Sequence, residues 1–167
     1  ATLTPTAGLT DTTNLITLDK TGVQDLSGNA GLGVINSNNY AIDTQRPTAT
    51  IVMADTALRI GDTSLVTITF SEAVSGFTNA DLTLVNGSMT AVSSSDGGIT
   101  WTGTFTPSAS ITDTSNVITL ANTGVSDLAG NAGTGTTDSA NYTIDTQRPT
   151  ATIVLADSNL SAGETSL

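Results

Sequence analysis

The chain has 167 residues, with 15 acidic and 4 basic side chains, neither cysteine nor histidine, and a formal net charge of −11. Without cysteine it can form no disulfide or thiolate metal site, and without histidine it lacks the commonest general base and a frequent transition-metal ligand. A surface this acidic repels nucleic acid and anionic membranes and attracts divalent cations. No apolar run has the length of a membrane span, so we expect no direct membrane insertion.

The sequence repeats itself with a period of 102 residues. The segment "IDTQRPTATIV" at 42–52 returns unchanged at 144–154, and 42 of the 65 positions in 1–65 are identical to their counterparts in 103–167. A period of this length fits a whole small domain rather than one turn of a solenoid. We therefore expect the C-terminal part of one repeat at 1–43, a complete repeat at 44–145 and the N-terminal strands of the next at 146–167, as in a window from a longer array.

Seven short strands are expected in the complete repeat. Threonine is the commonest residue, with 34 copies, and gives the chain the β-branched bias of strands. In 64–70, Val66, Ile68 and Phe70 alternate with two threonines, which is the period of a half-buried strand. The seven expected strands are 48–54, 64–70, 81–85, 88–94, 99–106, 116–121 and 141–144.

Turn residues separate these strands. Asn86-Gly87 predicts a hairpin between the third and fourth strands, and Asp96-Gly97-Gly98 predicts a turn before the fifth. In the fifth strand, Trp101 shares one face with Ile99 and Phe105, which makes it the expected core aromatic. Many short strands with turns between them predict an all-β chain of tandem immunoglobulin-like antiparallel β-sandwiches.

Alternate loops of such a sandwich gather at opposite ends. The loops at 71–80 and 122–140 are therefore expected where the chain enters the repeat, near Asp43, while Asp145 closes the other end. The oxygen-bearing candidates for a metal site are Asp43, Glu72, Asp81, Asp127, Asn131 and Asp145. Oxygen-only ligands favour Ca²⁺ over zinc or copper. The alternative is that these are solvated turn residues, since Asp, Asn and Gly favour turns for backbone reasons alone.

Three segments of the chain resemble a known group. "FSEAVSGFTNADL" (70–82), "GVSDLAGNAG" (124–133) and the doubled linker "IDTQRPTATIV" are similar to the tandem bacterial Ig-like repeats of giant biofilm-associated and RTX-type surface adhesins. The resemblance implies a secreted protein at the bacterial cell surface, in which many repeats form a stalk that extends an adhesive tip. It also implies Ca²⁺ at domain junctions, with Asp25, Asp43, Asp127 and Asp145 at the matching positions.

The sequence thus predicts a structural extender repeat that serves cell adhesion and biofilm formation. Its partners would be neighbouring copies of the repeat, in the same polymer or end to end between chains, while the adhesive target lies elsewhere in the protein. A carbohydrate- or receptor-binding Ig-like module is the alternative, because such domains present loops for recognition. We expect no enzyme, since the carboxylates lie in loops at the sandwich ends and nothing indicates a catalytic cleft.

Overall fold

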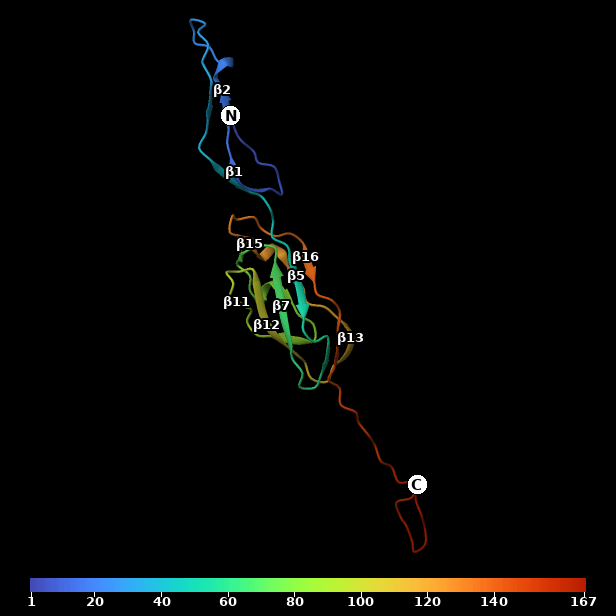
Figure 1. Cartoon of the computed structure of the whole chain (residues 1–167). Coiled ribbons are helices and arrows are strands. Elements are labelled where there is room, and N and C mark those ends of the chain that lie inside the picture. The colour runs from blue at the N-terminus through green and yellow to red at the C-terminus, as the bar shows by residue number, and fades with distance from the viewer.

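Residues 44–145 form two β-layers packed face to face. The chain enters this sandwich at one end and leaves it at the opposite end (Figure 1). The computed structural model describes residues 1–167. In the first layer the strand order is β10-β12-β7-β5, with β11 also paired to β12, and the pairings are antiparallel. Its strands are β5 (Ala49–Met53), β7 (Ser64–Phe70), β10 (Gly87–Met89), β11 (Ser93–Ser94) and β12 (Thr100–Pro107).

The second layer consists of short pieces in the orders β13-β17-β6, β16-β14-β9 and β15-β8. All pair antiparallel except β6, which runs parallel to β17. Its strands are β6 (Ala57–Arg59), β8 (Val74–Ser75), β9 (Leu82–Thr83), β13 (Thr112–Asn116), β14 (Thr119–Ala121), β15 (Ser126–Asp127), β16 (Thr136–Asp138) and β17 (Tyr142–Asp145). Short 3-10 turns, η2 (Asn79–Asp81) and η3 (Asn122–Gly124), precede β9 and β15.

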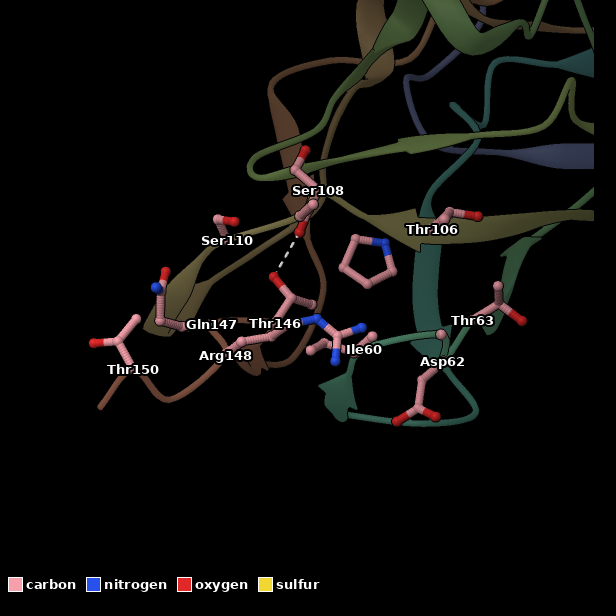
Figure 2. A pocket seen from close by; sticks show the side chains of 13 residues that line it. Ile60, Asp62, Thr63, Thr106, Ser108, Ser110, Thr146, Gln147, Arg148 and Thr150 are labelled. Atoms are coloured by element: carbon pink, nitrogen blue, oxygen red, sulfur yellow. Dashed lines mark hydrogen bonds between the residues drawn. The ribbon is translucent and has the colours of Figure 1, made fainter. Parts of the chain in front are cut away.

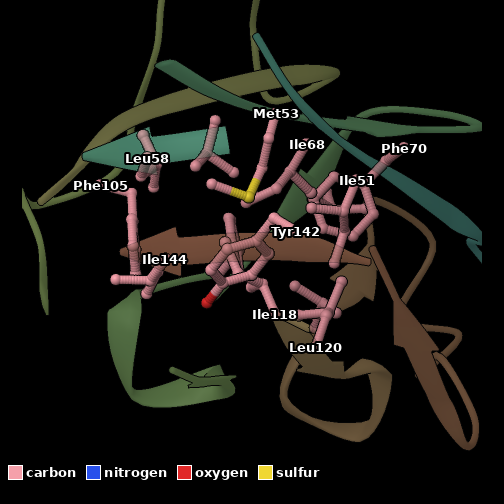
Figure 3. Close-up of a cluster of buried hydrophobic side chains, with 14 residues drawn as sticks. Ile51, Met53, Leu58, Ile68, Phe70, Phe105, Ile118, Leu120, Tyr142 and Ile144 are labelled. Carbon is pink, nitrogen blue, oxygen red and sulfur yellow. The ribbon is translucent and has the colours of Figure 1, made fainter. Parts of the chain in front are cut away.

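The core lies between these layers and is confined to this one repeat (Figure 3). The alternation predicted for 64–70 is confirmed, because Val66, Ile68 and Phe70 of β7 are buried. Phe105 of β12 and Tyr142 of β17 meet across the layers edge to face, with ring centroids 5.4 Å apart. Since all fourteen core residues fall between Ile51 and Ile144, the complete repeat has what it needs to fold alone.

Trp101 lies at the margin of this core rather than in its centre. It is half-buried and packs against the core, with its ring 5.3 Å from that of Phe77 in a T-shaped arrangement. Its Nε1 donates a hydrogen bond to the Gly98 carbonyl at 3.1 Å, which ties the ring to the turn before β12. That turn is as predicted, since β11 and β12 pair on either side of it.

The hairpin predicted at Asn86-Gly87 is wrong. The strands on either side belong to different layers, because β9 pairs with β14 and β10 pairs with β12. Asn86 takes the left-handed backbone conformation (φ 56°) where the chain crosses between layers. Gly87 is needed for close packing, since a Cβ there would collide with the ring of Phe105. The glycine therefore reports a tertiary contact, which the hairpin pattern cannot distinguish from a turn.

Five strands of the complete repeat, β6, β8, β13, β15 and β16, were not among the seven expected. They are short and mostly polar, and β13 reads Thr-Asp-Thr-Ser-Asn. Their pairing depends on neighbours that are distant in sequence, as for β13 with β17. Such polar segments show no alternation of apolar and polar residues from which a strand could be predicted.

The first repeat keeps the strand pairs of its counterpart but has no core. Its elements are β1 (Thr10–Asn14), β2 (Thr17–Asp19), η1 (Lys20–Gly22), β3 (Val34–Asn36) and β4 (Tyr40–Asp43), with β1 paired to β4 and β2 to β3. Ile16 is 53% exposed, whereas its counterpart Ile118 is fully buried. The pairing therefore needs only strands within residues 1–43, while burial requires the opposite layer.

Residues 146–167 form no strand, contrary to the expectation of the first strands of a next repeat. In the complete repeat β5 pairs with β7, and the counterpart of β7 starts only at Ser166, so the segment has no pairing partner. Several local bonds are repeated nevertheless: Ala156 N–H donates to the Leu167 carbonyl as Ala54 N–H does to that of Leu65, and Asp157 N–H donates to the Ser166 hydroxyl as Asp55 N–H does to that of Ser64.

A single hydroxyl in the core gives a test of the layer packing. The Tyr142 hydroxyl donates to the Val85 carbonyl at 3.1 Å, and burial, followed by the charge of Asp113, raises the pKa of Tyr142 from 10.0 to about 12. Tyr142→Phe removes this bond and should lower the free energy of unfolding in urea at pH 7 by about 1 kcal/mol. Tyr40→Phe, the same change in the first repeat, should leave it unchanged.

The loss of unfolding free energy caused by Tyr142→Phe should also depend on pH. Because the pKa of Tyr142 is higher in the folded state, the unfolded chain loses the proton first, and the wild type loses stability as pH rises from about 10 to 12. The variant lacks this group, so the gap between the two proteins should shrink over that range. A gap that stays constant from pH 7 to 12 would contradict the raised pKa.

Candidate metal centre

Three carboxylates meet where the chain passes from the first repeat into the second. Asp43 ends β4, Glu72 follows β7, and Asp127 ends β15, at the end of the sandwich where the linker enters (Figure 1). One carboxylate oxygen of each lies within 4.8 Å of the others. Asp127 is buried, and Asp43 and Glu72 are half-buried. We refer to these three residues as the carboxylate cluster.

Local sequence shapes the loop that presents Asp127. Asp127 accepts hydrogen bonds from the backbone N–H and the side-chain amide of Asn131, both at 2.8 Å, and Gly130 takes a positive φ of 92° to close the turn. The first repeat builds the same turn without a core, since Asp25 accepts the same two bonds from Asn29 at 2.9 Å. The turn 127–131 is therefore a property of its own residues.

Asn131 also joins this turn to the preceding repeat. Its Nδ2 donates to the Asp43 carbonyl at 3.1 Å as well as to Asp127 Oδ2. One residue further on, the Ala132 carbonyl accepts a hydrogen bond from Arg46 Nη1. Asn131 thus acts as a donor that positions the cluster, and Arg46 is a joint residue that the sequence argument did not single out.

The linker is bonded equally to the repeat before it. Thr44 Oγ1 accepts from Leu9 N–H at 3.0 Å and donates to the Thr6 carbonyl at 2.7 Å. At the second linker Thr146 makes the matching bonds to Ile111 and Ser108, at 3.0 and 2.7 Å. Threonine and arginine in "DTQR" therefore have opposite tasks: the threonine faces the repeat that ends, and Arg46 faces the repeat that begins.

Two carboxylates of the cluster have pKa values shifted in opposite directions. Burial, followed by the negative charges of Asp127 and Asp43, raises the pKa of Glu72. Burial also acts to raise the pKa of Asp127, but hydrogen bonds from Asn131 and from the Gly130 and Ala129 backbone outweigh it and leave this pKa lowered. Asp127 is thus held in its charged form, and the repulsion within the cluster falls on Glu72.

The other candidates lie outside the cluster. Asp81 caps η2 by accepting from Thr78 N–H at 2.9 Å, and it packs so closely on Gly124 that a Cβ there would collide with its carboxylate. Asp145 lies at the opposite end, where it accepts from the Thr112 hydroxyl at 3.2 Å. Counterparts of Glu72 and Asp127 that could face Asp145 would follow Leu167 in the repeat pattern. Of the six candidates, the structure brings together Asp43, Glu72, Asp127 and Asn131.

The chemistry of the cluster fits a hard cation. Its side-chain donors are all oxygens, and Ca²⁺ accepts six to eight of these in flexible geometry. Asp43, Glu72 and Asp127 would hold the ion, while Asn131 keeps Asp127 and the Asp43 carbonyl in place. A divalent cation there would supply the positive charge that offsets three neighbouring carboxylates.

Without divalent cations, Glu72 should destabilise the fold. Because its pKa is raised in the folded state, the stability conferred by protonated Glu72 is present below about pH 4.5 and is lost as pH rises through the folded-state pKa. In EDTA, Glu72→Gln should therefore raise the free energy of unfolding at pH 7, and this gain should vanish near pH 4. Urea titrations at both pH values measure it.

Glu164→Gln provides the control for this prediction. It makes the same chemical change at an exposed glutamate outside the complete repeat, and it should have no effect at either pH. A loss of stability for Glu72→Gln in EDTA at pH 7 would show that Glu72 is stabilised by its surroundings.

Comparisons with known proteins agree with this architecture. The family model described as "Bacterial Ig-like domain" matches the chain twice, over residues 1–42 and 43–144. None of the curated proteins and none of the solved structures compared matches the chain. In the structure, no helix has the length and apolar character that crossing a membrane requires. With two adjacent matches covering most of its length, the chain belongs to the family of bacterial Ig-like domains.

Proposed function

We propose that this chain is part of the extender stalk of a large secreted bacterial surface adhesin, in which tandem repeats hold an adhesive tip away from the cell. Bacterial Ig-like domains typically occur in extracellular or surface proteins. The two adjacent family matches, the 102-residue repeat and the strongly negative charge all suit a repeated, soluble spacer. Adhesion would be the task of another part of the protein.

The observation that carries this proposal is that the linker is bonded on both sides. Thr44 ties it to the first repeat, while the Asp43 carbonyl and Arg46 bind the turn at 127–132 of the second. A flexible tether would need none of these bonds. A stalk benefits from them because each bond restricts the angle between successive repeats, and the linker residues recur unchanged 102 positions later.

Calcium would stiffen the same joint. Asp43 ends β4 of the first repeat, whereas Glu72 and Asp127 follow β7 and end β15 of the second, so one ion held by all three would cross-link the two repeats. It would also offset the negative charges of Asp127 and Asp43, which add to the effect of burial in raising the pKa of Glu72. Calcium and the hydrogen bonds of Asn131 and Arg46 would then act on one angle.

A carbohydrate- or receptor-binding role is less well supported. The cavity at the exit end of the complete repeat has a volume of about 350 Å³ and is lined by Ile60, Pro107, Ala109 and mostly polar residues, without an aromatic platform for a sugar ring. The single tryptophan is engaged with Phe77 and the turn at Gly98. The joint therefore gives the better guide to function.

Calcium should raise the melting temperature of the full chain. An ion that binds only the folded state adds about 2.7 kcal/mol of stability at a free concentration 100 times its Kd. We expect calorimetry to show this rise for the wild type and for Glu164→Gln, and a much smaller one for Glu72→Gln. Equal melting temperatures for the wild type in Ca²⁺ and in EDTA would refute the calcium proposal and leave a plain spacer.

The stiffness of the joint can be measured on a tandem protein that consists of two consecutive copies of residues 44–145. Its internal joint is authentic, because residues 44–52 and 146–154 are identical. Asn131→Ala in the second copy removes the bond to the preceding linker and should broaden the small-angle scattering distance distribution. The same change in the first copy, which has no repeat before it, should leave the distribution unchanged. Equal effects of the two variants would argue against a bonded joint.

A further inference from the structure

A cavity opens at the end of the complete repeat where the chain leaves it. Its walls come from the β6–β7 loop, the β12–β13 loop and the second linker, and it encloses about 350 Å³. Figure 2 shows Arg148 of the linker turned toward Ile60 and Asp62 on the opposite wall. We call this space the exit cavity.

The exit cavity occupies the place of a joint. Thr146 and Arg148 line it, and they correspond to Thr44 and Arg46 at the first joint. There, Arg46 contacts the Ala132 carbonyl of the repeat that follows. The cavity therefore lies where the 127–132 turn of a following repeat would arrive.

The first joint has only part of this cavity. Residues 4–8 and 44–48 match two of its walls, but the first residue of the chain corresponds to Gly103, so the β6–β7 loop has no counterpart. At the first joint, therefore, no such loop is present to cover the side chain that the 127–132 turn would place against it.

One side chain of this turn is apolar and exposed. Leu128 is 79% exposed, and its identical counterpart Leu26 is fully exposed. Their neighbours behave differently, since Val125 is buried in the complete repeat whereas its counterpart Val23 is not. Completing a repeat buries the valine but not the leucine, so the leucine is not a core residue. A lone exposed leucine is ordinary, but this one lies in the turn that is bonded to the preceding linker.

We infer that the counterpart of Leu128 in a following repeat packs into the exit cavity of the complete repeat, against Ile60. The occupant is thus a second copy of this domain, in the array that the proposed function assumes. Ile60 is itself exposed on the cavity wall, and the methylenes of Arg148 lie beside it (Figure 2). Burial of two exposed apolar side chains against each other favours the contact. Because this contact does not depend on charge, it would fix the joint independently of calcium.

Cysteine cross-linking of the tandem protein tests this contact. The chain has no cysteine, so Ile60→Cys in the first copy and Leu128→Cys in the second can form only one intramolecular disulfide. Disulfides require Cβ atoms about 3.5–4.5 Å apart. The matched control keeps Ile60→Cys and places the second cysteine at Ser95, which is exposed in the β11–β12 turn at the entry end of the second copy. In both pairs the two cysteines lie in different copies, which the same linker connects.

The Leu128 pair should oxidise at least about tenfold faster than the Ser95 pair, since fixed proximity raises the effective concentration of one thiol near the other. Mass spectrometry at low protein concentration follows the reaction, in Ca²⁺ and in EDTA. Equal rates for the two pairs, or only intermolecular products, would overturn the inference. A fast Leu128 pair in EDTA together with a calcium-independent melting temperature would support the cavity contact and refute the calcium proposal. A calcium-dependent melting temperature with equal oxidation rates would do the reverse.

Discussion

The structure depends on the need of each apolar strand face for an opposing layer. Residues 1–43 and 103–145 have closely similar sequences and form the same strand pairs, yet only the second set has a core. Leu18 is half exposed, while its counterpart Leu120 is fully buried in the core, to which β7 also contributes. These strand pairs and turns therefore need only residues of the same 43-residue segment, whereas burial of the side chains requires residues 44–102. Since burial of apolar area is the dominant favourable contribution to folding, the repeat is the unit of stability.

This separation of local from distant interactions explains how a joint can be assembled. The turn at 127–131 has the same internal hydrogen bonds as the turn at 25–29, although only one belongs to a complete sandwich. A turn that is shaped by its own residues can offer Asn131 and Ala132 to a neighbouring repeat without disturbing the core. The linker then needs only Thr44 on one side and Arg46 on the other.

The sequence predicts those features whose signal is carried by neighbouring residues. The strand at 64–70 and the turn at 96–98 are examples, because alternation and glycine content are local. Asn86-Gly87 misleads, since Gly87 is required by the distant ring of Phe105. At the joint, the rule that alternate loops share an end predicts that Glu72 and Asp127 approach Asp43. It cannot foresee that Asp81 turns back to cap η2, or that Arg46 reaches Ala132, because these depend on side-chain direction and on the angle between repeats.

The membership of the carboxylate cluster couples fold stability to that angle. Glu72 and Asp127 belong to one repeat, so their repulsion acts within a single sandwich, whereas Asp43 brings its charge from the preceding repeat. Any cation that relieves the first repulsion also relieves the second, and thermodynamic linkage requires each effect to strengthen the other. A repeat that closes against its neighbour would then bind the ion more tightly than a repeat whose neighbour is displaced. On the proposed function, tension that bends or opens a joint would weaken ion binding at that joint first, so the stalk would yield at its linkers while the cores between Ile51 and Ile144 stay folded.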